Sequence, residues 1–140
     1  FMPMVAGTGG NSGTQASTAV IRALSLGEVH FSDLFQVLWK EFCVSVCCGL
    51  CLAGANFLKM MLVDRWLLRN PAVTPQVALV VCATLMGTVF CAKLVGCSLP
   101  LLAKRVGFDP AVMASPFITT IVDAISLLIY FRFASALLGI

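Results

Sequence analysis

The sequence predicts an all-α integral membrane protein, built as a bundle of about four transmembrane helices. Hydrophobic residues make up 60% of the chain and charged residues only 11%, whereas an ordinary soluble domain carries about 25% charged residues. The mean hydropathy is +1.02. A length of 140 residues provides one domain of about four spans at roughly 20 residues each. We therefore expect a multi-pass protein of the cell membrane, surrounded by the lipid bilayer.

The first element, residues 1–26, is unusually polar for a membrane span. Residues 7–15 read Gly-Thr-Gly-Gly-Asn-Ser-Gly-Thr-Gln, and these glycines predict a Gly-interrupted, irregular or kinked helix whose freed backbone carbonyls face a cavity. The chain begins inside this element, so we expect it to be a fragment of a longer parent protein. Residues 28–41 carry charged and aromatic side chains, which predict an interfacial turn or short helix outside the bilayer core.

Three more apolar stretches predict the remaining spans, over residues 42–62, 76–102 and 111–138. Two X-Pro pairs between residues 70 and 75 separate the first two of these spans. Pro110 suits the first helical position of the last span, and Asp109 is its expected N-cap. Lys and Arg residues lie at both sides of the predicted membrane, so the positive-inside rule gives only a slight preference for a cytoplasmic position of residues 22–40 and 104–105.

The charge pattern argues against several function classes. The net charge of +3 comes from scattered residues at span ends, with no basic run of the kind that binds nucleic acid. An intramembrane aspartyl protease needs a second membrane Asp, and the sequence holds no Ser/His or zinc-ligand set. We therefore expect no catalytic residues, no enzyme activity and no nucleic-acid partner.

Asp123 is the only acidic residue in the apolar run from Pro110 to Phe131. A carboxylate at this depth is costly and predicts an ion or proton pathway. Helical spacing places four more polar residues on its face: Ser115, Thr119, Ser126 and Tyr130. A second polar stripe follows the first element: Gly7, Gly10 or Asn11, Thr14 and Thr18. The two stripes predict one shared pathway; the alternative is that small polar residues only hold packed helices together.

These motifs resemble the transmembrane domain of MgtE-type magnesium channels. The likeness rests on residues 7–15 with Arg22-Ala23-Leu24, and on the stretch from Asp109-Pro110 through Ser-Pro-Phe-Ile-Thr-Thr-Ile-Val-Asp at residues 115–123. It covers nearly the whole chain. The resemblance implies a dimeric five-span domain that here lacks its first helix. It also implies a cytosolic magnesium-sensing part with CBS-type regulatory modules, which this sequence does not contain.

The resemblance further implies a pore on the axis of a homodimer, lined by the first and last elements of both subunits. Asp123 would be the central Mg²⁺ ligand, with the carbonyl of Thr119 beside it one turn earlier. Five residues match pore positions that contact the water shell of the ion: Gly7, Gly10, Thr14, Thr18 and Ser115. Thr14 and Ser115 stand where some members have Asn. Mg²⁺ prefers oxygen ligands and gives up its water reluctantly, so these side chains suit a hydrated ion.

The predicted function is passive conduction of Mg²⁺, which is both the transported and the bound ion. The alternative is a secondary transporter that exchanges Mg²⁺ for Na⁺ or H⁺, with Lys93 and Asp123 as a coupled pair. Lys93 can instead extend toward the interface or face a watery crevice.

The seven cysteines allow two interpretations. Cys43, Cys47 and Cys51 share one helical face, and thiolates at such spacing bind soft metals. We expect instead that the cysteines are small apolar residues that fill tightly packed spans, because no His accompanies them in these spans.

Overall fold

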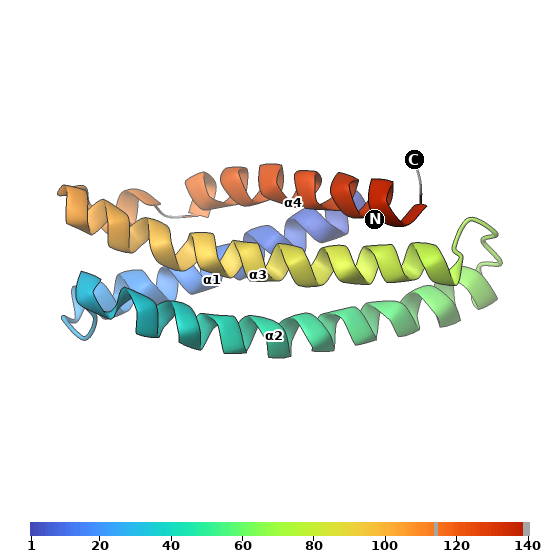
Figure 1. Cartoon of the computed structure of the whole chain (residues 1–140), viewed down its shortest axis with the longest axis horizontal. Coiled ribbons are helices and arrows are strands. Elements are labelled where there is room, and N and C mark those ends of the chain that lie inside the picture. Colours follow the sequence, from blue (N-terminus) through green and yellow to red (C-terminus); the bar gives the residue numbers. More distant parts are fainter. Residues whose placement is uncertain (114, 139–140) are drawn as a thin grey trace.

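A computed structural model of the chain describes residues 1–113 and 115–138, which form four helices, each antiparallel to the one before it in the chain (Figure 1). These are α1 (Met2–Ser25), α2 (Leu34–Lys59), α3 (Pro75–Val106) and α4 (Ser115–Leu138). A π-helix, Met60–Leu67, continues α2, and short 3-10 helices, Phe31–Asp33 and Pro110–Met113, precede α2 and α4. The structure confirms the predicted all-α class.

Three segments are long and apolar enough to cross a membrane: Phe31–Leu67, Pro75–Val106 and Pro116–Ala136. The more polar α1 is not among them, although its 24 residues would reach about 36 Å at 1.5 Å per residue. The chain is thus a multi-pass membrane protein, and the membrane crossing of α1 stays a prediction.

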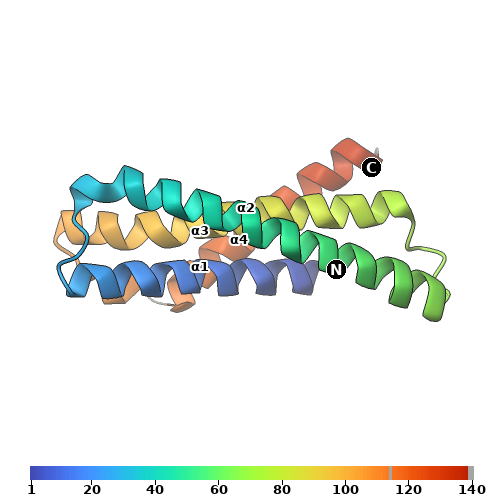
Figure 2. The same ribbon diagram turned by 90° about the horizontal axis from the view of Figure 1, so that it is seen from below.

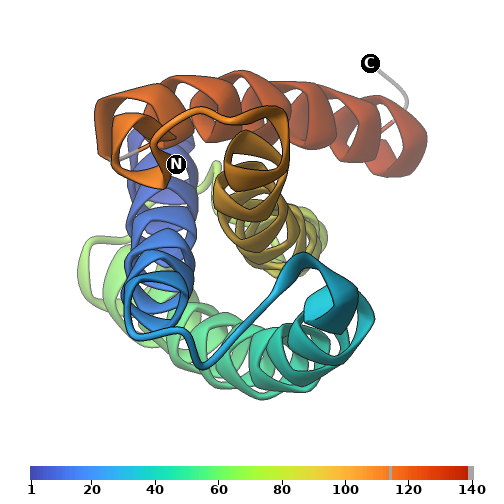
Figure 3. The same ribbon diagram turned by 90° about the vertical axis from the view of Figure 1, so that its left-hand side faces the viewer.

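Helix α3 occupies the centre of the bundle. It packs against α1, α2 and α4, and α1 also packs against α4. Seen along the bundle, α2 and α4 lie on opposite sides of α3 (Figure 3), and α4 crosses the others at an angle so that its C-terminal half diverges from α1 (Figure 2). The polar elements α1 and α4 therefore share one side of the molecule.

The prediction of a kinked, Gly-interrupted first element is wrong, because α1 is a continuous α-helix. Its glycines instead allow a close crossing with α3. A Cβ added to Gly96 would collide with the backbone oxygen of Gly13, and one added to Gly13 would lie 3.2 Å from the backbone oxygen of Ala92. A Cβ on Gly9 would likewise meet the side chain of Thr88. Small residues four apart on both helices produce this contact, as is common between membrane helices.

Two hydrophobic clusters hold the ends of the bundle. At one end Val5 of α1 packs with Met60, Val81 and Leu85. The other cluster joins α1 to the second half of α3 through Ala16, Val20, Leu24, Cys97 and Leu101. Both clusters contain α1 and α3, so this pair forms the framework on which α2 and α4 rest.

The helix ends largely follow local sequence signals. The Thr74 side chain accepts a hydrogen bond from the Val77 N–H at 3.2 Å, and Gly107 ends α3 with φ 87°, a left-handed conformation that favours glycine. Asp109 Oδ1 accepts a hydrogen bond from the Ala111 N–H, so it caps the 3-10 helix before α4 and not α4 itself. Helix α2 begins at Leu34, eight residues before the predicted start of the second span at residue 42, and the position of residues 34–41 outside the bilayer core stays a prediction.

Candidate functional site

Gly10 of α1 faces Thr119 and Asp123 of α4, so three predicted site residues lie together. A Cβ built on Gly10 would lie 3.3 Å from Thr119 Cγ2 and 3.7 Å from Asp123 Oδ1. Because Gly10 has no side chain, the backbone of α1 comes close to the carboxylate of Asp123. Asp123 is half-buried in the subunit, and no ion pair joins it to another side chain among the described residues.

The polar stripe of α1 continues along its exposed side. Gly7, Asn11 and Thr18 are exposed, and Thr14 is half-buried. The Thr18 hydroxyl donates to the Thr14 carbonyl oxygen at 2.9 Å, while the Thr14 hydroxyl oxygen is buried in the subunit and has no hydrogen-bond partner among the described residues. One side of the subunit thus presents glycine backbone, hydroxyl and amide groups of α1 next to the carboxylate of α4.

The last span carries two residues whose placement differs from that of Asp123. Ser126 is only 1% exposed, and its hydroxyl donates to the Val122 carbonyl oxygen at 2.6 Å. It points toward Gly9, inside the subunit, so the expectation that it shares the wet face of Asp123 is not met. Ser115 begins α4, and its side chain lies outside the described part of the chain.

Lys93 is paired with Glu41 and not with Asp123, which corrects the expected coupled pair. Its ammonium lies 3.0 Å from the Glu41 carboxylate, and the two side chains are 11% and 16% exposed. The pair joins α3 to α2, on the side of α3 away from α4 (Figure 1). Glu41 lies in the segment, residues 28–41, that the sequence predicts as interfacial, and the helix that begins at Leu34 places it opposite Lys93. The expectation that Lys93 extends to the interface is wrong as well.

The cysteines of α3 and those of α2 differ in exposure. Cys82 and Cys97 of α3 are buried, as a packing role predicts, and Cys91 of the same helix is half-buried. Cys43, Cys47, Cys48 and Cys51 are exposed on α2, so the prediction that they fill a packed interface within the subunit is wrong. Only α3 packs extensively against α2, and these four thiols lie on the rest of its circumference.

Comparison with known proteins places this geometry in context. The family model MgtE, described as a divalent cation transporter, matches residues 2–133. The magnesium transporter MgtE of Thermus thermophilus is 37% identical over 139 residues, which are 99% of this chain and 29% of that protein. The magnesium transporter MgtE of Bacillus subtilis is 35% identical over 136 residues, which are 97% of this chain and 28% of that protein. The chain thus spans less than a third of the length of these curated relatives.

Proposed function

The chain belongs to the MgtE family of divalent cation transporters, and on that premise we propose that it forms the pore of a channel that conducts hydrated Mg²⁺ passively. The observation that carries the proposal is the contact of Gly10 with Thr119 and Asp123. This contact joins the two polar helices, α1 and α4, at the carboxylate of Asp123, which has no cationic partner among the described side chains.

The chemistry of this contact suits Mg²⁺. The ion demands six oxygen ligands near 2.1 Å and usually keeps several waters, so a carboxylate flanked by a threonine and open backbone fits the hydrated ion better than the bare one. The candidate metal ligands are the Asp123 carboxylate and the Thr119 carbonyl. Gly7, Asn11, Thr14 and Thr18 would line the pathway beside them, whereas the buried Ser126 no longer fits a pore-lining role.

One subunit supplies one carboxylate, and the polar side of α1 and α4 stays open within that subunit. We propose that a second copy covers this side and that the pore runs along the axis of the homodimer. Two Asp123 side chains facing each other would repel, and a divalent cation between them would relieve that repulsion. By the family likeness, cytosolic CBS-type modules of the full-length protein would regulate this pore.

The experiment is a liposome flux assay with the full-length protein in the absence of a sodium or proton gradient. We expect Mg²⁺ to enter with the wild-type protein and Asp123→Asn to abolish entry or remove the preference for divalent ions. Glu28→Gln is the matched control, because it removes an equal charge from an exposed position in the α1–α2 connection.

Each other outcome has a defined meaning. Flux that requires an opposing Na⁺ or H⁺ gradient would replace the channel with an exchanger. Wild-type flux and selectivity in Asp123→Asn would return Asp123 to a structural role and overturn the proposed pore.

A further inference from the structure

We propose that the end of α2 binds the phosphate head group of an anionic phospholipid between Arg65 and Arg69. The two arginines lie in the π-helix that extends α2 and in the connection to α3. This site is separate from the proposed pore, because α2 packs mainly on α3 and the pore elements are α1 and α4.

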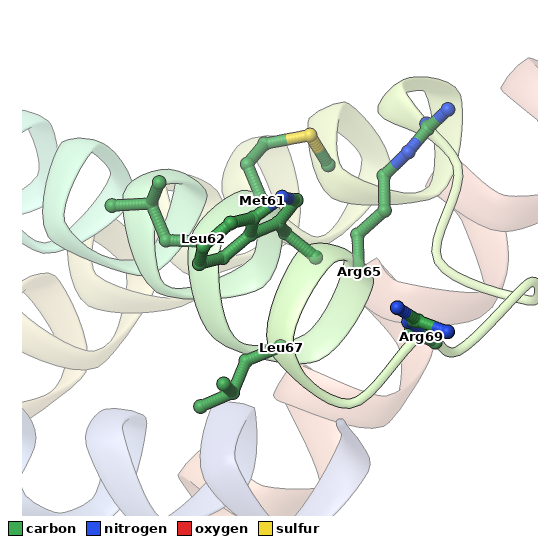
Figure 4. A pocket seen from close by; sticks show the side chains of 6 residues that line it. Met61, Leu62, Arg65, Leu67 and Arg69 are labelled. Atoms are coloured by element: carbon green, nitrogen blue, oxygen red, sulfur yellow. The ribbon is translucent and has the colours of Figure 1, made fainter.

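The surface here is hollowed on both sides of the arginines. One hollow of about 830 Å³ is lined by apolar side chains together with both guanidinium groups: Met61, Leu62, Arg65, Trp66, Leu67 and Arg69. Figure 4 shows the side chains of Arg65 and Arg69 extending toward the connection that leaves the helix, and those of Leu62 and Leu67 extending away from it. A second hollow of about 400 Å³ shares the arginines and adds Asn70 and Thr74.

The two guanidinium groups have no acidic partner in the described part of the chain. Asp64, the acidic residue next to them, is already held by the Lys59 ammonium at 2.8 Å. No ion pair involves Arg65 or Arg69 among the residues that the structure describes. The acidic residues of the connections, Glu28, Asp33 and Asp109, lie at the opposite end of the bundle (Figure 1). This end therefore carries positive charge that favours the binding of an anion.

The depth of the site fits a lipid head group. The 26 residues of α2 and the 8 residues of the π-helix reach about 50 Å at 1.5 Å per residue. A bilayer is about 30 Å thick in its hydrocarbon core and about 40–45 Å with its head groups, so a helix of this length extends past the core and can place its last turn among the head groups. Trp66 is 77% exposed and Leu62 60% exposed, and exposed Trp is typical of the membrane interface.

The division of the site into an apolar and a polar side matches an amphiphile. An acyl chain would lie along Leu62 and Trp66, and the phosphate oxygens would meet the paired N–H donors of the guanidinium groups. Asn70 and Thr74 use their side-chain oxygens to accept hydrogen bonds from Ala72 and Val77. Their amide N–H and hydroxyl O–H groups consequently remain as donors toward the head group.

The test is quenching of Trp66 fluorescence by brominated lipids in the full-length protein. The Trp66 signal is the difference between the wild-type protein and Trp66→Phe, which removes any contribution from other tryptophans. The quantity measured is the ratio of association constants for brominated phosphatidylglycerol and brominated phosphatidylcholine. We expect a ratio above about fivefold, since one basic residue near an anionic surface contributes about that factor.

Arg65→Gln/Arg69→Gln should bring the ratio close to one, while circular dichroism reports an unchanged helix content. The matched control is Arg22→Gln/Lys40→Gln, which removes two exposed basic residues from the other end of the bundle and should leave the ratio unchanged.

Three results would overturn the proposal. A ratio near one in the wild-type protein would show that the site does not select anionic lipid. A ratio that survives the double substitution at the arginines would place the preference elsewhere. Loss of the preference on adding inorganic phosphate at constant ionic strength would assign the arginines to a soluble anion.

Discussion

Removing the charge of Lys93 alone should lower the free energy of unfolding far more than removing the charges of Lys93 and Glu41 together. The pair joins α2 to α3 at 3.0 Å with both side chains at least four-fifths buried. Lys93→Met would leave the Glu41 carboxylate without its cation, and breaking one side of such a buried pair costs about 3–5 kcal/mol. Lys93→Met/Glu41→Met replaces both charges with apolar side chains, which is often neutral or stabilising.

The second ion pair of α2 provides the comparison. Lys59 lies 2.8 Å from Asp64, and the two side chains are 51% and 13% exposed, so the carboxylate is buried while the ammonium is open to solvent. The contribution of this pair should fall between the values of about 0.2–1 kcal/mol for exposed pairs and about 3–5 kcal/mol for buried ones. We expect Lys59→Met to lower the free energy of unfolding by less than Lys93→Met does, although the N–O distance of the Lys59 pair is the shorter of the two.

The assay is reversible unfolding of the full-length protein in bicelles, followed by tryptophan fluorescence for the wild type, both single variants at Lys93 and Glu41, and the double variant. The expected coupling energy between the two positions is about 3 kcal/mol, or roughly two orders of magnitude in the unfolding equilibrium. Additive single effects, or a cost at Lys93 no larger than that at Lys59, would refute the argument from burial.

Two glycine substitutions test the helix crossings, and a glycine of α2 serves as the control for both. Gly96→Ala places a methyl group against the backbone of α1 and should cost about 1–3 kcal/mol of unfolding free energy, whereas Gly54→Ala of α2, whose added Cβ meets nothing within 4 Å, should stabilise the helix by up to about 1 kcal/mol. Gly10→Ala should lower Mg²⁺ flux by more than half with less than about 1 kcal/mol change in stability, because its Cβ would press on Thr119 at 3.3 Å. Gly54→Ala, which lies outside the proposed pathway and has open space around its Cβ, should conduct like the wild type, and equal flux in both variants would contradict the proposed pore.

Hydropathy alone sufficed to predict the helical bundle, but the course of α1 depended on a partner that the local sequence does not contain. Glycines in a row are compatible with a kink or with a close crossing. The small residues of α3 that lie opposite Gly9 and Gly13 show that these glycines allow a close crossing and do not produce a kink. The start of α2 was missed for a similar reason, since Lys40 and Glu41 look interfacial until Lys93 is found 52 residues further on.

Helical periodicity predicted that Thr119 and Asp123 share a face, and the structure agrees. It failed at Ser126, which is rotated by about 60° from Asp123. That rotation brings Ser126 toward the side of Ile118 and Val122, both fully buried. Helical spacing alone therefore does not decide whether a polar residue at the edge of a stripe is exposed or buried. The nearness of Gly10 to Asp123 required the packing of two helices that are far apart in sequence.

The crossing of Gly13 and Gly96 also limits how this molecule changes shape. Two helices in contact through their side chains can slide past each other, because the side chains adopt new rotamers in the new register. Two helices in contact through their backbones cannot slide in this way, because the backbone has no rotamers to change. Helices α1 and α3 should consequently move as one body in any gating cycle. The contact of α1 with α4 runs through side chains of α4, among them Ile118, Val122 and Thr119, and side chains can change rotamer. Displacement that widens or narrows an ion path would then fall to α4, the helix that carries the carboxylate.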